Sequence, residues 1–240
     1  MTRGSGAQVK TAAGGRGFFP PPLALANGTV EAIKWIALLL MVVDHVNKYV
    51  FHEASATAFF AGRLVMPLFA FVLAFNLARP GSIERGGGKR TLARLLLIGA
   101  ASTVPYIALG DVLFGWWPLN IMATLAVAVA MIELLSRGTT LSAVGAGAVF
   151  LVGGALVEFW WPGVIACVAA WFYCRRPSWM ALAVWVGALS ALYVINRNLG
   201  ALLALPVIFG ASQIRLRLPR VKWFFYLFYP AHLAALWMIR

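Results

Sequence analysis

Long apolar stretches, separated by short groups of charged residues, glycine or proline, make up most of this chain. A helix that crosses the hydrocarbon core of a bilayer needs about 20 apolar residues. Nine stretches approach this length, so the pattern predicts an all-α, polytopic bundle of about nine transmembrane helices. The predicted spans are 32–51, 58–78, 91–109, 118–135, 141–158, 163–174, 179–195, 199–214 and 222–240.

The sixth of these stretches, 163–174, is short for a helix that crosses a membrane. The residues at its start, Trp-Trp-Pro-Gly at 160–163, include two residue types that commonly interrupt helices. The stretch is therefore compatible with a tilted helix, a re-entrant segment or the continuation of a neighbouring helix. It contains Cys167 and Cys174, which have no metal-ligand pattern around them, and we interpret both as packing residues.

The composition of the chain indicates which solvent surrounds it. Of the 240 residues, 62% are hydrophobic and 11% are charged, and the mean hydropathy is +0.86. Because water-soluble domains are far more polar, the chain is predicted to be an integral membrane protein. Residues 1–30 are rich in glycine and proline and lack the apolar core of a signal peptide, which predicts a flexible, uncleaved cytoplasmic arm. Residues 31–240 are predicted to form one transmembrane domain.

The formal net charge of +13 is distributed unevenly along the chain. If the N-terminal arm is cytoplasmic, nearly all loop Lys and Arg residues fall on the cytoplasmic side, as the positive-inside rule requires. The sequence therefore predicts a cytoplasmic N-terminus and a periplasmic C-terminus. We attribute the charge to this topology and to anionic lipid head groups, not to nucleic-acid binding. The basic segment from Arg79 to Arg94 also suits the phosphates of a cytosolic cofactor.

Several polar side chains fall inside the predicted helices, where ionisable groups are costly and usually functional. At a rise of 1.5 Å per residue, Asp44 and His45 lie about 5 Å beyond the bilayer centre on the first helix. Other helices carry polar groups to the same layer, between the middle of the membrane and its outer face. These groups are Arg63, Asn120, Thr124, Glu158, Asn196, Arg197, Asn198 and His232. We interpret this layer as a candidate functional site.

Asp44 and His45 are adjacent in sequence, yet helix geometry separates their roles. Neighbouring residues on a helix point about 100° apart, so Asp44 is poorly placed to orient His45. Asp44 is predicted to pair with Arg63, or with Lys48 four residues along the same helix. His45 is the candidate catalytic base because an imidazole accepts protons near neutral pH, and its partner is expected on the fourth or ninth helix.

Structural interpretations stay open for several of these polar residues. Asn120 occupies the position of a helix cap, and Asp44 with Lys48 has the spacing of an ordinary helix-surface pair. Glu158 and Arg197 have the positions of residues solvated at the membrane interface.

Known catalytic motifs are largely missing from the chain. The segment Gly-Gly-Gly-Lys at 86–89 is not a P-loop, because Ile83 and Arg90 replace its first glycine and its Ser or Thr. We find no serine nucleophile elbow, zinc-protease motif or metal triad, so we expect no metal cofactor. A transfer reaction in which one histidine deprotonates an amine or a hydroxyl fits the residues that remain.

Five short motifs give the chain a family resemblance. They are Ile33 to Leu38 leading into Met41 to His45, Gly62 to Phe71, Arg94-Leu95 with Pro105, Asn120 to Leu125, and Phe228 to Leu233. Together they resemble the TraX family over most of residues 31–240. Members of that family are associated with conjugative plasmids and acetylate the N-terminus of the pilin subunit in the inner membrane. They are distantly similar to membrane acyltransferases that use acyl-CoA.

The resemblance implies an acetyltransferase of the bacterial inner membrane, with cytosolic acetyl-CoA as donor and a conjugative pilin as acceptor. In this interpretation His45 accepts the amine proton, while Arg63, Asn120 or His232 positions the thioester or stabilises the oxyanion. The full assignment is His45, Asp44, Arg63 and His232 for catalysis, Asn120, Thr124, Tyr229 and Glu158 for substrate binding, and Lys34, Arg90 and Arg94 for acetyl-CoA.

Other functions remain compatible with the same residues. A pilin-processing or assembly factor without acetyl transfer would use the polar layer for docking, or for another modification such as cyclisation. An acyltransferase for periplasmic sugars would need the same base, because a hydroxyl is deprotonated in the same way as an amine. A transporter for a small anion is a further alternative.

Overall fold

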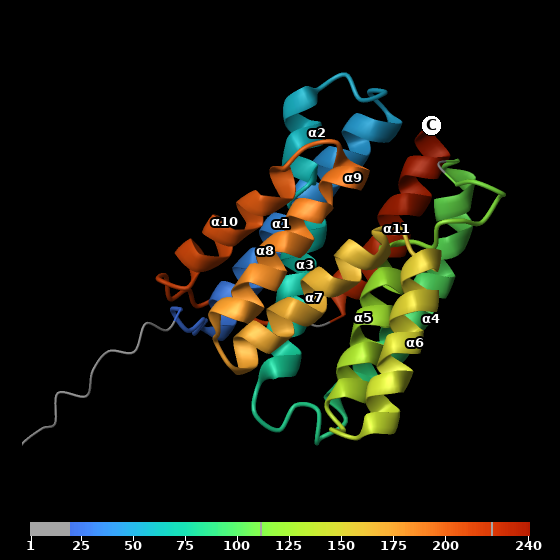
Figure 1. Cartoon of the computed structure of the whole chain (residues 1–240). Coiled ribbons are helices and arrows are strands. Elements are labelled where there is room, and N and C mark those ends of the chain that lie inside the picture. The colour runs from blue at the N-terminus through green and yellow to red at the C-terminus, as the bar shows by residue number, and fades with distance from the viewer. Residues whose placement is uncertain (1–19, 111, 222) are drawn as a thin grey trace, which may run out of the picture.

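The computed structural model of the chain describes residues 20–110, 112–221 and 223–240. Across these residues the regular secondary structure is helical, with two isolated β-bridges and no strand, which confirms the predicted all-α class. Figure 1 shows the helices gathered side by side in a bundle. In chain order they are α1 (Asn27–Tyr49), α2 (Ala56–Gly62), α3 (Val65–Ala78), α4 (Gly87–Ala108), α5 (Ile121–Leu135), α6 (Thr140–Leu156), α7 (Trp160–Arg175), α8 (Trp179–Ala191), α9 (Tyr193–Asn196), the 3-10 helix η1 (Gly200–Leu203), α10 (Ala204–Ala211) and α11 (Phe224–Ile239).

Each predicted apolar stretch corresponds to one helix or to two consecutive helical segments. Helices α2 and α3 cover the second stretch, and α8 and α9 cover the seventh. The second stretch is interrupted at Arg63 and Leu64 because Pro67 has no N–H with which to bond the Arg63 carbonyl. The fourth begins at Ile121 instead of residue 118, since Asn120 caps α5 there.

The exterior of the bundle suits a lipid environment. Three segments are long and apolar enough to cross a membrane, namely Ala56–Ala78, Gly87–Ala108 and Trp179–Asn196, and four shorter apolar helices accompany them. Large apolar side chains point outward, such as Leu141, 83% exposed, and Met180, 75% exposed. The chain is therefore a helical membrane protein. Nine membrane crossings and the sides on which the termini lie stay predictions.

The structure describes residues 20–30 of the predicted N-terminal arm, and these residues are folded against the bundle. Helix α1 begins at Asn27, and Leu23 is already buried against the bundle. The Tyr173 hydroxyl donates a hydrogen bond of 2.6 Å to the Pro21 carbonyl, which ties this segment to α7. Residues 20–30 are thus part of the folded domain, and residues 1–19 of the predicted arm lie outside the described residues.

Helix α7, which covers the short sixth stretch, is a separate helix at the centre of the bundle. It packs against α3, α5, α6 and α8, and it crosses the bundle at a tilt in Figure 1. Pro162 lies in its first turn, where a missing N–H breaks no hydrogen bond, so the predicted interruption does not occur. Cys167 is fully buried within it, which confirms its interpretation as a packing residue.

The helices form two groups that meet along α5 and α7. One group contains α1, α2, α3, α7, α8 and α10, and the other contains α4, α5, α6 and α11. The backbones of α1 and α11 come close at only a few positions, and side chains such as Trp35 and Phe225 fill the contact between them. The space between α1 and α3 on one side and α4, α5 and α11 on the other therefore remains open as a cavity.

Candidate functional site

The cavity between the two helix groups has a volume of about 400 Å³ and a strongly basic mouth. Its residues near helix ends and in the α3–α4 and α10–α11 loops carry six cationic side chains, and no Asp or Glu is among the described residues that line it. These cations are Lys34, Arg79, Arg85, Arg90, Arg94 and Arg220. Gly87, in the first turn of α4, also lines the cavity and adds the partial positive charge of a helix N-terminus. We refer to this space as the basic cavity.

The arginines of the mouth lack a carboxylate partner among the described residues, whereas Lys34 has one. Lys34 forms a 2.7 Å ion pair with Glu31. Burial, and then the nearby charge of Arg220, lowers the pKa of Arg79 from its ordinary value. Arg94 lies over the Trp223 ring, 5.2 Å from its centroid. Positive charges gathered in this way favour an anionic ligand, above all a phosphate.

The opposite end of the basic cavity is lined by Met41, Ile121, Met122 and Tyr229. Lys34, Leu38 and Met41 follow one face of α1 at helical spacing, and His45 is the next residue on that face. On α11, Tyr229 lies one turn before His232, and the two rings are 5.6 Å apart. The cavity therefore ends one helical turn short of both histidines.

His45 and His232 contact each other directly. The Nδ1 atom of His45 lies 2.7 Å from Nε2 of His232, and the two rings meet edge to edge and nearly coplanar, with centroids 5.0 Å apart and an interplanar angle of 11°. This contact confirms the prediction that His45 finds its partner on another helix, here the ninth predicted one. On the far side of His232, its Nδ1 atom lies 3.2 Å from the Phe228 carbonyl oxygen.

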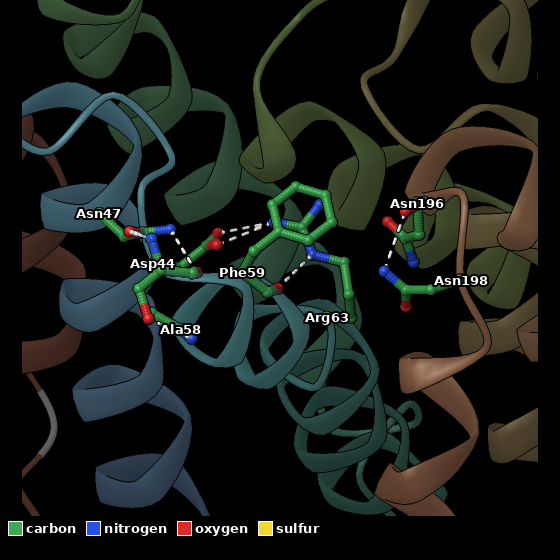
Figure 2. Close-up of polar contacts among 8 residues, drawn as sticks. Asp44, Asn47, Ala58, Phe59, Arg63, Asn196 and Asn198 are labelled. Atoms are coloured by element: carbon green, nitrogen blue, oxygen red, sulfur yellow. Dashed lines mark hydrogen bonds and ion pairs between the residues drawn. The ribbon is translucent and has the colours of Figure 1, made fainter.

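Asp44 pairs with Arg63, as predicted. The Arg63 Nη2 atom donates to both carboxylate oxygens, at 2.8 and 3.0 Å, and Nε donates to the Phe59 carbonyl at 3.1 Å (Figure 2). The Arg63 guanidinium also lies over the Phe59 ring, 4.2 Å from its centroid. A Cβ at Gly62 would overlap the Asp44 carboxyl group, so glycine makes room for the pair. Asp44 and Arg63 thus join α1 to the α2–α3 junction.

Glu158 and Tyr229 meet at the start of α5. The Glu158 N–H donates to Leu119 O at 2.8 Å, and the Glu158 carboxyl group lies close to the Ile121 backbone N–H. The Tyr229 hydroxyl lies at the same Ile121 N–H and interacts electrostatically with Glu158. The charges of Asp44 and Arg63 also act on Glu158. The structure therefore brings Asp44, His45, Arg63, Glu158, Tyr229 and His232 together, and we call these six residues the polar cluster.

Asn120 and Thr124 lie differently from what their assignment as substrate contacts implies. Asn120 Oδ1 accepts from the Met122 N–H at 3.1 Å, and its Nδ2 donates to Gly99 O at 3.0 Å. This geometry supports the alternative interpretation of Asn120 as a helix cap, which also joins α4 to α5. Thr124 is fully buried beside Gly163 and does not line the basic cavity.

The remaining predicted residues, Lys34, Arg90 and Arg94, all line the basic cavity. The sequence assignment missed Arg220, which lies far along the chain but reaches the same mouth. The signal available for it was the predicted topology, because Arg215 to Lys222 falls on the same side of the membrane as Arg79 to Arg94.

The fold and the site define a helical membrane protein in which a basic cavity leads from one end of the bundle toward a partly buried histidine pair. Residues 29–240 match the profile of the family described as TraX protein, so the chain belongs to the TraX family. Protein TraX of Escherichia coli and Protein TraX of its strain K12 are both 36% identical over 106 residues, which cover 44% of this chain and 40% of each relative. No solved structure matches the chain.

Proposed function

We propose that the protein is an integral membrane acetyltransferase that transfers an acetyl group from acetyl-CoA to the N-terminal amine of a conjugative pilin subunit. The observation that carries this proposal is the basic cavity, whose cationic mouth and histidine-proximal end match the two ends of an acyl-CoA. One end of that donor carries phosphates and the other carries the reactive thioester.

The mouth of the basic cavity supplies what a phosphate-bearing donor needs. Arginine forks bind phosphate through paired N–H donors, and the N-terminus of α4 adds oriented backbone dipoles. Arg79, Arg94 and Arg220 come from three separate segments, so they surround a ligand from several sides. Under the positive-inside rule this mouth faces the cytosol, where acetyl-CoA is made.

The distance along α1 suits a donor that reaches from the mouth to the polar cluster. From Lys34 to His45 the helix advances 11 residues, or about 16 Å at 1.5 Å per residue. The lining between these positions is mostly apolar, with Leu38, Met41 and Phe69 among its residues. An extended arm with an apolar character fits this path, and its thioester would lie at the end of the cavity, one helical turn from His45.

The chemistry proposed at the polar cluster is a direct acyl transfer with His45 as base. His45 removes a proton from the acceptor amine while the amine nitrogen forms a bond to the thioester carbon. The carbon–sulfur bond then breaks, and the proton passes from the imidazole to the departing thiolate of CoA. Tyr229 and Ile121 line the end of the basic cavity, where an oxyanion would develop, and the Tyr229 hydroxyl is the donor that we propose to stabilise it.

The test of this function is a transfer assay with the purified protein in detergent. Acetyl-CoA labelled in its acetyl group is mixed with the cognate pilin, and the intact mass of the pilin is measured. We expect the pilin mass to increase by one acetyl group and the label to appear at its N-terminus. An unlabelled pilin whose assembly still depends on this protein would replace the proposal with an assembly factor, and labelled sugar with unlabelled pilin would change the acceptor.

Binding of the donor should depend on the arginines of the mouth. Replacing Arg79 and Arg94 by glutamine is expected to weaken CoA binding by about tenfold or more for each guanidinium removed from a phosphate, since a hydrogen bond to a charged group contributes about 1.5–3 kcal/mol. Isothermal titration with CoA measures the change. Acetyl-pantetheine, which has no phosphates, should bind wild type and variants equally.

A matched control is Arg137→Gln, because Arg137 is exposed just after the C-terminal end of α5 and does not line the cavity. It should bind CoA like the wild type. An equal loss of affinity in this control would mean that overall charge, and not the basic cavity, governs binding.

A further inference from the structure

The two ring nitrogens of His232 have different partners, and this difference indicates which of them carries the hydrogen. Nδ1 lies 3.2 Å from the Phe228 carbonyl oxygen, and Nε2 lies 2.7 Å from Nδ1 of His45. A carbonyl oxygen can only accept a hydrogen bond, so Nδ1 of His232 carries a hydrogen. A neutral imidazole has one N–H donor and one acceptor nitrogen, and Nε2 of His232 is therefore the acceptor.

The hydrogen-bond direction then extends to His45. Because Nε2 of His232 accepts, Nδ1 of His45 must donate, and the unshared electron pair of His45 is on Nε2. We infer that His232 is a positioning residue that holds His45 in the tautomer whose Nε2 atom is free to act as a base. This inference rests on the proposed function for the role of His45, but the tautomer itself exists without any substrate.

The surroundings of the pair favour neutral rings over a charged one. Both rings are partly buried, and the cations Lys48 and Arg63 interact electrostatically with His45. The nearest carboxylate in sequence, Asp44, directs both of its oxygens to Arg63 and so does not orient the imidazole. In Ser-His-Asp triads a carboxylate sets the histidine tautomer. In this protein a neutral second histidine, His232, takes the role of that carboxylate toward His45.

Aromatic packing fixes the orientation of the chain of hydrogen bonds. The His232 ring is nearly parallel to the Phe228 ring, at 5.3 Å and 10°, and nearly coplanar with the His45 ring, at 5.0 Å and 11°. Phe228 and His232 are four residues apart on α11, so the helix itself sets their overlap. During transfer His45 gains a proton on Nε2 and continues to donate through Nδ1, while His232 keeps its own proton throughout.

Two substitutions separate positioning from packing. His232→Gln retains a side-chain oxygen that accepts from His45 but removes the ring, whereas His232→Phe retains an aromatic ring next to Phe228 but removes the acceptor. We expect the glutamine variant to keep most of the transfer rate. The phenylalanine variant should lose about 100-fold or more in kcat, with KM for acetyl-CoA unchanged. The reverse order, with phenylalanine active and glutamine inactive, would overturn the inference in favour of packing.

A spectroscopic measurement decides the tautomer independently of activity. Nitrogen-15 NMR of histidine-labelled protein in detergent distinguishes protonated from unprotonated ring nitrogens, and the chain has only 3 histidines to assign. We expect a protonated Nδ1 and an unprotonated Nε2 for His45 in wild type, and loss of this preference in His232→Phe. An Nε2-protonated His45 would overturn the inference. If no acetyl transfer occurs but the tautomer is as expected, the proposed function fails and the assignment of protons remains.

Discussion

Replacing Arg63 by methionine is expected to destabilise the protein by about 3–5 kcal/mol, because it removes the guanidinium that donates to both oxygens of the Asp44 carboxylate. The side chains of Arg63 and Asp44 are only 17% and 13% exposed, so water cannot substitute for the missing partner. Nε of Arg63 also donates to the Phe59 carbonyl, and the substitution removes this hydrogen bond as well. Unfolding of the detergent-solubilised variant, followed by tryptophan fluorescence during heating or SDS titration, measures the change.

The companion variants separate removal of the ion pair from removal of bulk. Asp44→Asn combined with Arg63→Met removes both charges and should recover most of the stability, because no unpaired ion remains. Arg137→Met, at an exposed position, should leave the midpoint of unfolding unchanged. If Arg63→Met alone is as stable as this control, the Asp44–Arg63 pair does not hold α1 to the α2–α3 junction.

The helical pattern was predictable because it depends on local sequence. A run of apolar residues specifies a membrane helix almost by length alone, so the segments around α4 and α8 were predicted close to their observed ends. The environment of α7 was not predictable in the same way. Its 16 residues, Trp160–Arg175, are covered on several faces by four other helices, and nothing in a single apolar run distinguishes protein neighbours from lipid.

The contacts of the candidate site were predictable only where helix geometry restricts them. Asp44 and His45 point in different directions on α1, which argued against a contact between these two side chains. Asp44 therefore needed a partner elsewhere, and Arg63 was predicted for it. The basic cavity depends instead on how α1, α3, α4, α5 and α11 pack together. Such packing brings residues as far apart in the sequence as Lys34 and Arg220 to the same cavity. Neither the periodicity nor the spacing of the sequence predicts that these two residues line one site.

Replacing His45 by asparagine should lower kcat for acetyl transfer by about 100- to 10,000-fold, the range that a general base contributes. Asparagine places an amide near the position of the imidazole Nδ1, so it can still donate to Nε2 of His232. What it removes is Nε2, the atom proposed to take the amine proton. Stopped assays with labelled acetyl-CoA and pilin measure the rate, and titration with CoA measures donor affinity, which should not change.

The control for His45→Asn is His52→Asn, in the exposed turn after α1. His52 has a positive φ of 50°, a backbone conformation that asparagine tolerates well, so this variant should fold and transfer acetyl groups like the wild type. Retained transfer in His45→Asn would remove His45 from the mechanism, and the polar cluster would then have to act through Tyr229 or Glu158 at the start of α5. If His45→Asn loses both CoA binding and acetyl transfer, the role of His45 would be to shape the basic cavity and not to transfer a proton.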